Sequence, residues 1–168
     1  MKTPLNAEHL FEVLLKLIKP HISQHTGLVG IYTGGVWLAR RLHSALALPG
    51  EPGVIDVSFY RDDYSEKGLH TRPMKTRIPF DVTQTDILLI DDVLYTGRTT
   101  RAAINELFDY GRPARIDLAV LVDRGGRELP IEPLFCARKL EEPLLPTQNL
   151  QLDCDDSGTL TLRLTDAQ

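Results

Sequence analysis

Two neighbouring carboxylates, Asp91 and Asp92, follow directly after an apolar run over residues 87–90. The run is short and rich in branched side chains, which predicts a strand buried on both faces. We therefore expect both carboxylates where that strand ends, at the edge where open α/β sheets bind ligands. Carboxylates in such a place can accept hydrogen bonds from the vicinal hydroxyl groups of a sugar.

A loop of small and hydroxyl-bearing residues follows the two carboxylates and leads into a predicted helix over residues 98–110. Thr96, Gly97 and Thr99 can wrap backbone N–H groups and hydroxyls around an anion at the helix N-terminus. Two carboxylates beside a phosphate cradle suit a ribose 5-phosphate. The alternative is an acidic turn followed by a helix that Asp or Thr caps.

A second loop, Thr33-Gly34-Gly35, lies between a predicted strand over residues 28–32 and a predicted helix over 36–47. The glycine pair permits unusual backbone torsions and a close approach to an anion. The alternative is a plain strand-to-helix turn.

A third loop begins at Asp123 and Arg124, where an apolar strand predicted over residues 116–122 ends. Asp123 could help to hold hydrated Mg²⁺, which keeps several of its waters when it travels with a diphosphate. For Arg127 a structural salt bridge is an equal alternative to a binding role. Because the carboxyl ends of parallel strands share one edge, the three loops are expected to converge on one crevice.

Other elements complete an α/β fold with a mostly parallel central sheet flanked by helices. Asn6 can cap a first helix whose apolar residues continue to Ile18, and Pro20 stops the pattern. Residues 61–79 form a polar segment without periodicity, which predicts a flexible loop or hood that closes over the site; a solvated loop is the alternative. Further strands are expected over 54–60 and 134–137, with a closing β-hairpin around residues 150–164.

The composition indicates a globular chain. The 168 residues favour one domain over 1–168, and 42% of them are hydrophobic. No segment is apolar enough to span a bilayer, which predicts a cytoplasmic protein. Cys136 and Cys154 lack metal-ligand spacing and are expected to be free thiols. The net charge of −4 argues against indiscriminate binding of nucleic acid.

The order of these motifs resembles that of the bifunctional pyrimidine-operon regulatory protein/uracil phosphoribosyltransferase family, which has the type I phosphoribosyltransferase fold. The resemblance runs from about residue 28 to 131 and is carried by Val29-Gly30-Ile31, Leu38-Ala39-Arg40-Arg41-Leu42, Tyr60-Arg61-Asp62-Asp63, the segment 91–99, Asp109-Tyr110-Gly111-Arg112-Pro113, Leu118-Ala119-Val120-Leu121-Val122-Asp123-Arg124-Gly125 and Arg127-Glu128-Leu129-Pro130-Ile131.

The resemblance implies a bacterial, cytoplasmic, dimer-based oligomer that uses Mg²⁺. It implies transfer of ribose 5-phosphate from phosphoribosyl pyrophosphate to uracil, which gives uridine monophosphate (UMP) and pyrophosphate. In many members it also implies control of pyrimidine genes through leader RNA and uridine nucleotides. The catalytic residues would be Asp91 and Asp92, and the substrate-binding residues Thr33, Gly34, Gly35, Arg61, Asp62, Val93, Leu94, Tyr95, Thr96, Gly97, Arg98, Thr99, Val122, Asp123 and Arg124.

The chain departs from the family pattern at three positions near these loops. Gly34 stands where the family usually has arginine, Gly126 where it has histidine and Glu132 where it has a cation. The loss of a cation at the pyrophosphate loop predicts weak turnover, and the alternative is a nucleotide-sensing regulator with little or no catalysis. Acidic Glu132 opposes phosphate contact; Arg127 and Arg138 remain as candidates for RNA binding. A purine is an alternative accepting base.

Overall fold

Five parallel strands form the central sheet of the computed structural model, which describes residues 5–58 and 75–166. The spatial order is β2-β1-β3-β4-β5. The strands are β1 (Gly27–Ile31), β2 (Gly53–Ile55), β3 (Asp86–Leu94), β4 (Arg115–Asp123) and β5 (Phe135–Lys139). The α/β class expected from the alternation of strands and helices is confirmed.

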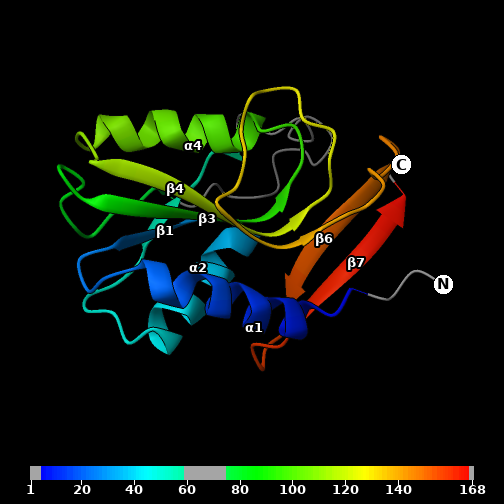
Figure 1. Ribbon diagram of the computed structural model, residues 1–168, viewed down its shortest axis with the longest axis horizontal. Coiled ribbons are helices and arrows are strands. Elements are labelled where there is room, and N and C mark those ends of the chain that lie inside the picture. Colours follow the sequence, from blue (N-terminus) through cyan, green and yellow to red (C-terminus); the bar gives the residue numbers. More distant parts are fainter. Residues whose placement is uncertain (1–4, 59–74, 167–168) are drawn as a thin grey trace.

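Helices cover both faces of this sheet (Figure 1). On one face lie α1 (Ala7–Ile18), which continues into the short η1 (Lys19–His21), and α2 (Gly34–Ala45); on the other lies α4 (Arg98–Asp109). Side chains alternate along β3, so that Leu88 and Ile90 pack with α1 and α2 while Ile87 and Leu89 pack with α4. The buried strand predicted at residues 87–90 is therefore confirmed.

The amino-terminal helix and the carboxyl-terminal hairpin hold each other. Asn6 caps α1 as predicted, since its side chain accepts the N–H of His9 at 3.0 Å. The predicted hairpin is present as β6 (Gln148–Cys154) and β7 (Leu160–Asp166). The Glu8 carboxylate of α1 accepts hydrogen bonds from the N–H of Leu160 at 2.7 Å and from Nη1 and Nη2 of Arg41 at 3.0 and 2.9 Å. Hydrogen bonds from Arg41 are the main cause that holds the pKa of Glu8 below its usual range.

Several boundaries differ from the predicted ones. β3 does not end before Asp91 but continues to Leu94, because β4 keeps pairing with it as far as Leu94 and Asp123. α2 begins at Gly34 instead of residue 36. β2 ends at Ile55 rather than near residue 60, because the Asp56 carboxylate turns the chain by accepting the N–H of Ser58 at 2.9 Å.

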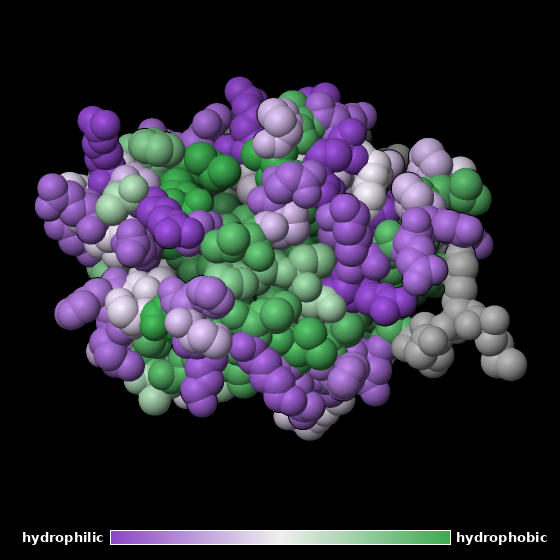
Figure 2. Space-filling model, viewed as in Figure 1, coloured by the Kyte–Doolittle hydropathy of each residue, from purple (hydrophilic) through white to green (hydrophobic). Residues whose placement is uncertain are grey.

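Hydrophobic residues gather on the face of the molecule seen in Figure 2, between α4 and α1. Among the helices of the described residues, none has the length and apolar character needed to cross a membrane.

Candidate functional site

The loop after β1 lies directly against the end of β3. Tyr32 and Thr33 are joined by a cis peptide, and α2 starts at the next residue, Gly34. A Cβ atom on Gly34 would lie 2.4 Å from Oδ2 of Asp92, and one on Gly35 would lie 2.3 Å from the carbonyl oxygen of Ile90. Both glycines are thus required by the close approach of α2 to β3, which brings the first two candidate loops together.

The two carboxylates have different surroundings. Asp91 is buried, with 4% of its surface exposed, and accepts the N–H of Asp92 at 2.9 Å. Asp92 is only partly buried. Asp91 therefore orders the end of β3, while Asp92 is the carboxylate more open to a ligand.

The amino terminus of α4 carries no side-chain cap. Its N-cap residue is Gly97, whose φ of 91° lies in the left-handed region that favours glycine. The hydroxyl of Thr96 accepts the N–H of Arg98 at 3.2 Å. The N-cap residue of α4 is thus neither Asp nor Thr, and the Thr96 hydroxyl accepts one backbone N–H, that of Arg98, so the first turn of α4 has further donors and a positive dipole end for an anion.

Tyr95 lies between parts of the third loop. The guanidinium of Arg124 stacks 3.9 Å from the centre of the Tyr95 ring, and the N–H of Arg124 donates to the carbonyl of Leu94 at 3.0 Å. Burial lowers the pKa of Arg124, and its Nε is a buried donor without a hydrogen-bond partner among the described residues. A Cβ atom on Gly126 would lie 2.5 Å from Cε2 of Tyr95, so the absence of a side chain there leaves the ring its place.

Asp123 and Arg127 form an enclosed ion pair. The Arg127 guanidinium donates to both carboxylate oxygens of Asp123 at 3.0 and 2.7 Å, and the N–H of Gly125 donates to Oδ1 at 3.0 Å. Burial raises the pKa of Asp123, but the hydrogen bonds from Arg127 and Gly125 outweigh it, so this pKa lies below its usual range.

This pair bears on two of the roles expected from the sequence. The Asp123 side chain is 2% exposed and both its oxygens are engaged, so it is not free to ligate Mg²⁺ directly. Arg127 forms the structural salt bridge that was the alternative to a binding role, and its side chain is 16% exposed. Within residues 5–58 and 75–166, no group of three or more His, Cys, Asp or Glu side chains could hold a metal ion.

Other expected site residues lie apart or outside the described residues. Arg61 and Asp62 belong to residues 59–74, which the structure does not describe, as does most of the expected hood. Arg77 exchanges backbone hydrogen bonds with Val54 at 2.8 Å and pairs with Glu51, which places it at the sheet edge. Val122 is buried within β4, and Arg138 is exposed on β5.

The contacts between the loop after β3, which contains Thr96, and the third loop include residues that the sequence did not single out. Glu128 and Leu129 donate their backbone N–H groups to the carbonyl of Thr96 at 3.0 and 3.1 Å, and the Glu128 carboxylate accepts from Arg98 at 2.7 Å. Backbone donors leave no signature in side-chain type. The only hint is the neighbouring pair Gly125 and Gly126, both with positive φ, which turns the loop back onto Thr96.

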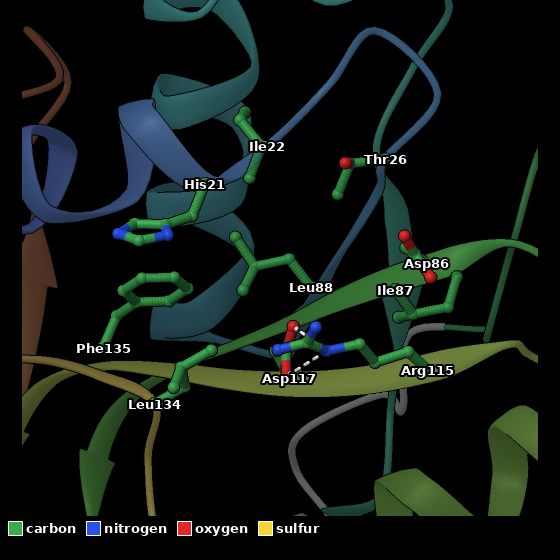
Figure 3. A pocket seen from close by; sticks show the side chains of 10 residues that line it. All are labelled: His21, Ile22, Thr26, Asp86, Ile87, Leu88, Arg115, Asp117, Leu134 and Phe135. Atoms are coloured by element: carbon green, nitrogen blue, oxygen red, sulfur yellow. Dashed lines mark hydrogen bonds and ion pairs between the residues drawn. The ribbon is translucent and has the colours of Figure 1, made fainter.

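A surface cleft of about 110 Å³ lies at the opposite edge of the sheet. Figure 3 shows His21 over Phe135 and the Arg115–Asp117 ion pair along its wall. Asp86 and Arg115, which line it, are the first residues of β3 and β4. The cleft is therefore separate from the candidate site at the carboxyl ends of the same strands.

Comparison with known proteins identifies the family. Residues 8–146 match the family model of the phosphoribosyl transferase domain. The chain belongs to the phosphoribosyltransferase family. The match includes the central sheet and all three loops, whereas the hairpin lies beyond it.

Relatives narrow the position of this phosphoribosyltransferase within its family. It is 48% identical to the bifunctional protein PyrR of Ralstonia nicotianae over 140 residues, which cover 81% of this chain and 80% of that protein. It is 41% identical to PyrR of Nitrosococcus oceani, with 96% and 94% covered. The chain is therefore a PyrR-type phosphoribosyltransferase.

A solved structure supports the fold. The crystal structure of a purine phosphoribosyltransferase from Pyrococcus horikoshii superimposes with a TM-score of 0.60 at 24% identity, covering 83% of this chain and 85% of that one. The type I phosphoribosyltransferase fold expected from the motifs is thereby confirmed.

Proposed function

We propose that this PyrR-type protein transfers ribose 5-phosphate from phosphoribosyl pyrophosphate to uracil, giving UMP and pyrophosphate. The observation that carries the proposal is the contact of the glycine loop of α2 with Asp92, a carboxylate that precedes the Gly97 N-cap of α4 by five residues. The glycine loop offers one anion site beside this carboxylate, and the first turn of α4, which follows Asp92 in the chain, offers a second. A ribose with a phosphate at each end requires two such sites.

Different residues of the site bind the phosphate and the ribose of the substrate. The backbone N–H groups at Thr96–Thr99 and the dipole of α4 bind the 5′-phosphate. Asp92 accepts hydrogen bonds from the ribose hydroxyls, and Asp91 holds the backbone of Asp92 in place. Together the two negative charges stabilise the positive charge that develops on the ribose as the bond to pyrophosphate breaks.

Thr33, Gly34 and Gly35 bind the leaving pyrophosphate through their backbone. Mg²⁺ bound to the diphosphate would neutralise part of the negative charge of the diphosphate. Asp92 is the carboxylate open enough to accept a hydrogen bond from a metal-bound water, and Asp123 is not. The absence of arginine at position 34 leaves this site one cation short, so we expect slow turnover.

The base binds at the end of β4, beside Tyr95 and Arg124. A ring nitrogen of uracil forms a bond to the anomeric carbon while the bond from that carbon to pyrophosphate breaks, and the proton of the nitrogen passes to solvent. Backbone groups of the loop after β4 can pair with the carbonyl oxygens and N–H groups of uracil, while the buried Arg124 supports the Tyr95 ring on which it stacks. We infer a uracil acceptor from the family resemblance, and a purine is the alternative that a base panel tests.

Further parts of the proposal concern the protein's setting. The PyrR relatives are named bifunctional, which supports a second role in regulating pyrimidine genes through uridine nucleotides and leader RNA. The exposed Arg138 is the basic residue that we propose for RNA contact.

We propose one domain over residues 1–168, in which Glu8 links the hairpin to α1. A dimer-based oligomer in the cytoplasm agrees with the apolar surface of Figure 2 and with two free cysteines.

Thermal protection tests the assignment of the substrate site. Phosphoribosyl pyrophosphate with Mg²⁺, and separately UMP, should raise the unfolding temperature of the wild-type protein. The Asp92→Asn/Thr96→Val variant should lose both effects, each measured against its own unliganded unfolding temperature, which the loss of the Thr96–Arg98 hydrogen bond lowers. Undiminished protection of this variant would overturn the site.

A nucleotide-sensing regulator with little or no catalysis is the second candidate, and Gly34 is the observation that favours it. The two candidates share ligand binding and differ in turnover. Protection by UMP without formation of UMP from uracil would support the regulator.

A further inference from the structure

Arg127 donates four hydrogen bonds from its guanidinium to protein acceptors. Nε donates to the carbonyl of Ile131 at 2.7 Å, and Nη1 donates to the carbonyl of Tyr95 and to Oδ1 of Asp123, both at 3.0 Å. Nη2 donates to Oδ2 of Asp123 at 2.7 Å and lies 3.5 Å from the Glu132 carboxylate, which is 72% exposed. Four of the five N–H donors of the rigid guanidinium fork are thus bonded within the protein, and Nη2 also forms an ion pair with Glu132.

These acceptors come from separate segments of the chain. Asp123, Ile131 and Glu132 flank Arg127 in its own segment, whereas Tyr95 belongs to the phosphate loop after β3. The hydrogen bond from Nη1 to the carbonyl of Tyr95 is therefore the one that joins the two loops through Arg127. The two loops also meet beside Arg127, since a Cβ on Gly97 would lie 3.0 Å from Cγ1 of Ile131. The Arg127 side chain is 16% exposed, so it forms the centre of this junction and not its surface.

We propose that Arg127 is a positioning residue that sets the distance between the bound ribose 5-phosphate and the accepting base. It does so by fixing the base-side loop, residues 123–131, against the phosphate loop, residues 95–99. The inference rests on the proposed transfer reaction. A displacement of about 1 Å between reacting groups can cost about 100-fold in rate, so a joint between the two substrate loops affects the chemical step.

The geometry distinguishes this role from that of a phosphate ligand. Four N–H groups of Arg127 are bonded to protein acceptors, and its Nη2 also forms an ion pair with the acidic Glu132, which opposes an anion at this position. Lysine cannot replace this arrangement, because one ammonium group offers three donors from a single point and cannot reach the carbonyls of Tyr95 and Ile131 and both oxygens of Asp123 together.

Steady-state kinetics of Arg127→Lys and Arg127→Gln test the proposal, with Arg112→Gln as the control. Arg112 is an exposed arginine after α4, at the far edge of the sheet. We expect kcat for UMP formation to fall about 100-fold in both Arg127 variants and to stay within about threefold in the control. The dissociation constant for phosphoribosyl pyrophosphate with Mg²⁺ should change less than about threefold in all of them, since α4 and β3 hold the phosphate loop independently.

A double variant separates positioning from stability. Asp123→Asn/Arg127→Gln removes the charge that a single substitution leaves buried and unpaired, so its unfolding temperature should exceed that of Arg127→Gln. Its kcat should nevertheless stay low. Recovery of kcat together with stability would reduce Arg127 to a structural role and overturn the proposal. So would an Arg127→Lys variant with kcat within threefold of the wild type, or a loss of substrate binding as large as the loss in kcat.

Amide hydrogen exchange tests whether Arg127 joins the two loops without a measurement of catalysis. Arg127→Lys should speed exchange in peptides over residues 95–99 and 123–131 at least about tenfold, and leave α1 unchanged. If the wild-type protein forms no UMP, the proposed function fails, and exchange alone decides whether Arg127 joins the two loops. Unchanged exchange in both segments would overturn the proposal.

Discussion

Gly34 faces Asp92 so closely that a Cβ atom on the glycine would lie 2.4 Å from Oδ2, 2.6 Å from Cγ and 2.9 Å from Cβ of the aspartate. Any side chain at position 34 must therefore displace the Asp92 carboxylate, which we assign to the ribose and the metal-bound water. The family resemblance led us to expect arginine at position 34. The Asp92 carboxylate occupies the space that its side chain would need, so glycine at position 34 and the position of Asp92 depend on each other.

Gly34→Arg and Gly34→Gln form a pair that separates charge from space. Both variants carry the same displacement of Asp92, and only one adds a cation beside the leaving pyrophosphate. We expect kcat/KM for phosphoribosyl pyrophosphate to be about tenfold higher in Gly34→Arg than in Gly34→Gln, because one charge-assisted hydrogen bond is worth about 1.5 kcal/mol. Initial rates of UMP formation measure the ratio. Equal values in the two variants would show that a cation here does not assist the reaction.

Asp123→Asn should lower the free energy of unfolding by about 3 kcal/mol at pH 7, because it leaves a buried arginine without its main partner. The pKa of Asp123 is lowered in the folded state. Its contribution is therefore fully present above the ordinary carboxyl pKa and is lost as pH falls through the lower folded value. Urea unfolding from pH 7 to pH 3 should show the difference between the two proteins narrowing below about pH 4. A difference independent of pH would contradict the assigned pair.

Glu8→Gln should loosen the carboxyl-terminal hairpin, because Glu8 joins Leu160 to Arg41. We expect a loss of about 1 kcal/mol, discounted for the exposure of the side chain, and faster proteolysis near residues 155–160. The lowered pKa of Glu8 means that this contribution also disappears as pH falls through the folded value. Glu12→Gln, an exposed change on the same helix, is the control. Equal effects of the two substitutions would refute the link.

Gly126→His introduces the residue that the family resemblance led us to expect here and should displace Tyr95, whose Cε2 would lie 2.5 Å from the new Cβ. Gly158→His is the matched control, since Gly158 has φ of 86° against 84° for Gly126 but no atom within 4 Å of its Cβ position. Both variants suffer the strain of a positive φ, of order 1 kcal/mol. Only Gly126→His should also raise KM for the base, by roughly tenfold. Similar kinetic effects in both would leave Tyr95 without a role in base binding.

The sequence predicted the parts of this site that depend on chain order. The apolar run before Asp91 and the glycine pair at Gly34 indicated two loops at one sheet edge, and the structure has them there. The predicted end of β3 was wrong. Pairing of β3 with β4 continues beyond Asp91 and depends on tertiary structure, which local residue propensities do not predict. The link from Arg127 to the phosphate loop could not be resolved from sequence, since its acceptor there is the backbone carbonyl of Tyr95, a group that every residue type offers.

The measurement that tests the central claim most directly is the formation of UMP from uracil, phosphoribosyl pyrophosphate and Mg²⁺ by the purified wild-type protein. Hypoxanthine and guanine are run in parallel, with Asp92→Asn as the inactive control. We predict turnover with uracil that is absent without Mg²⁺, at least about 100-fold below the wild-type rate in Asp92→Asn, and not matched by either purine. No nucleotide product with any base, or equal turnover with a purine, would contradict the account.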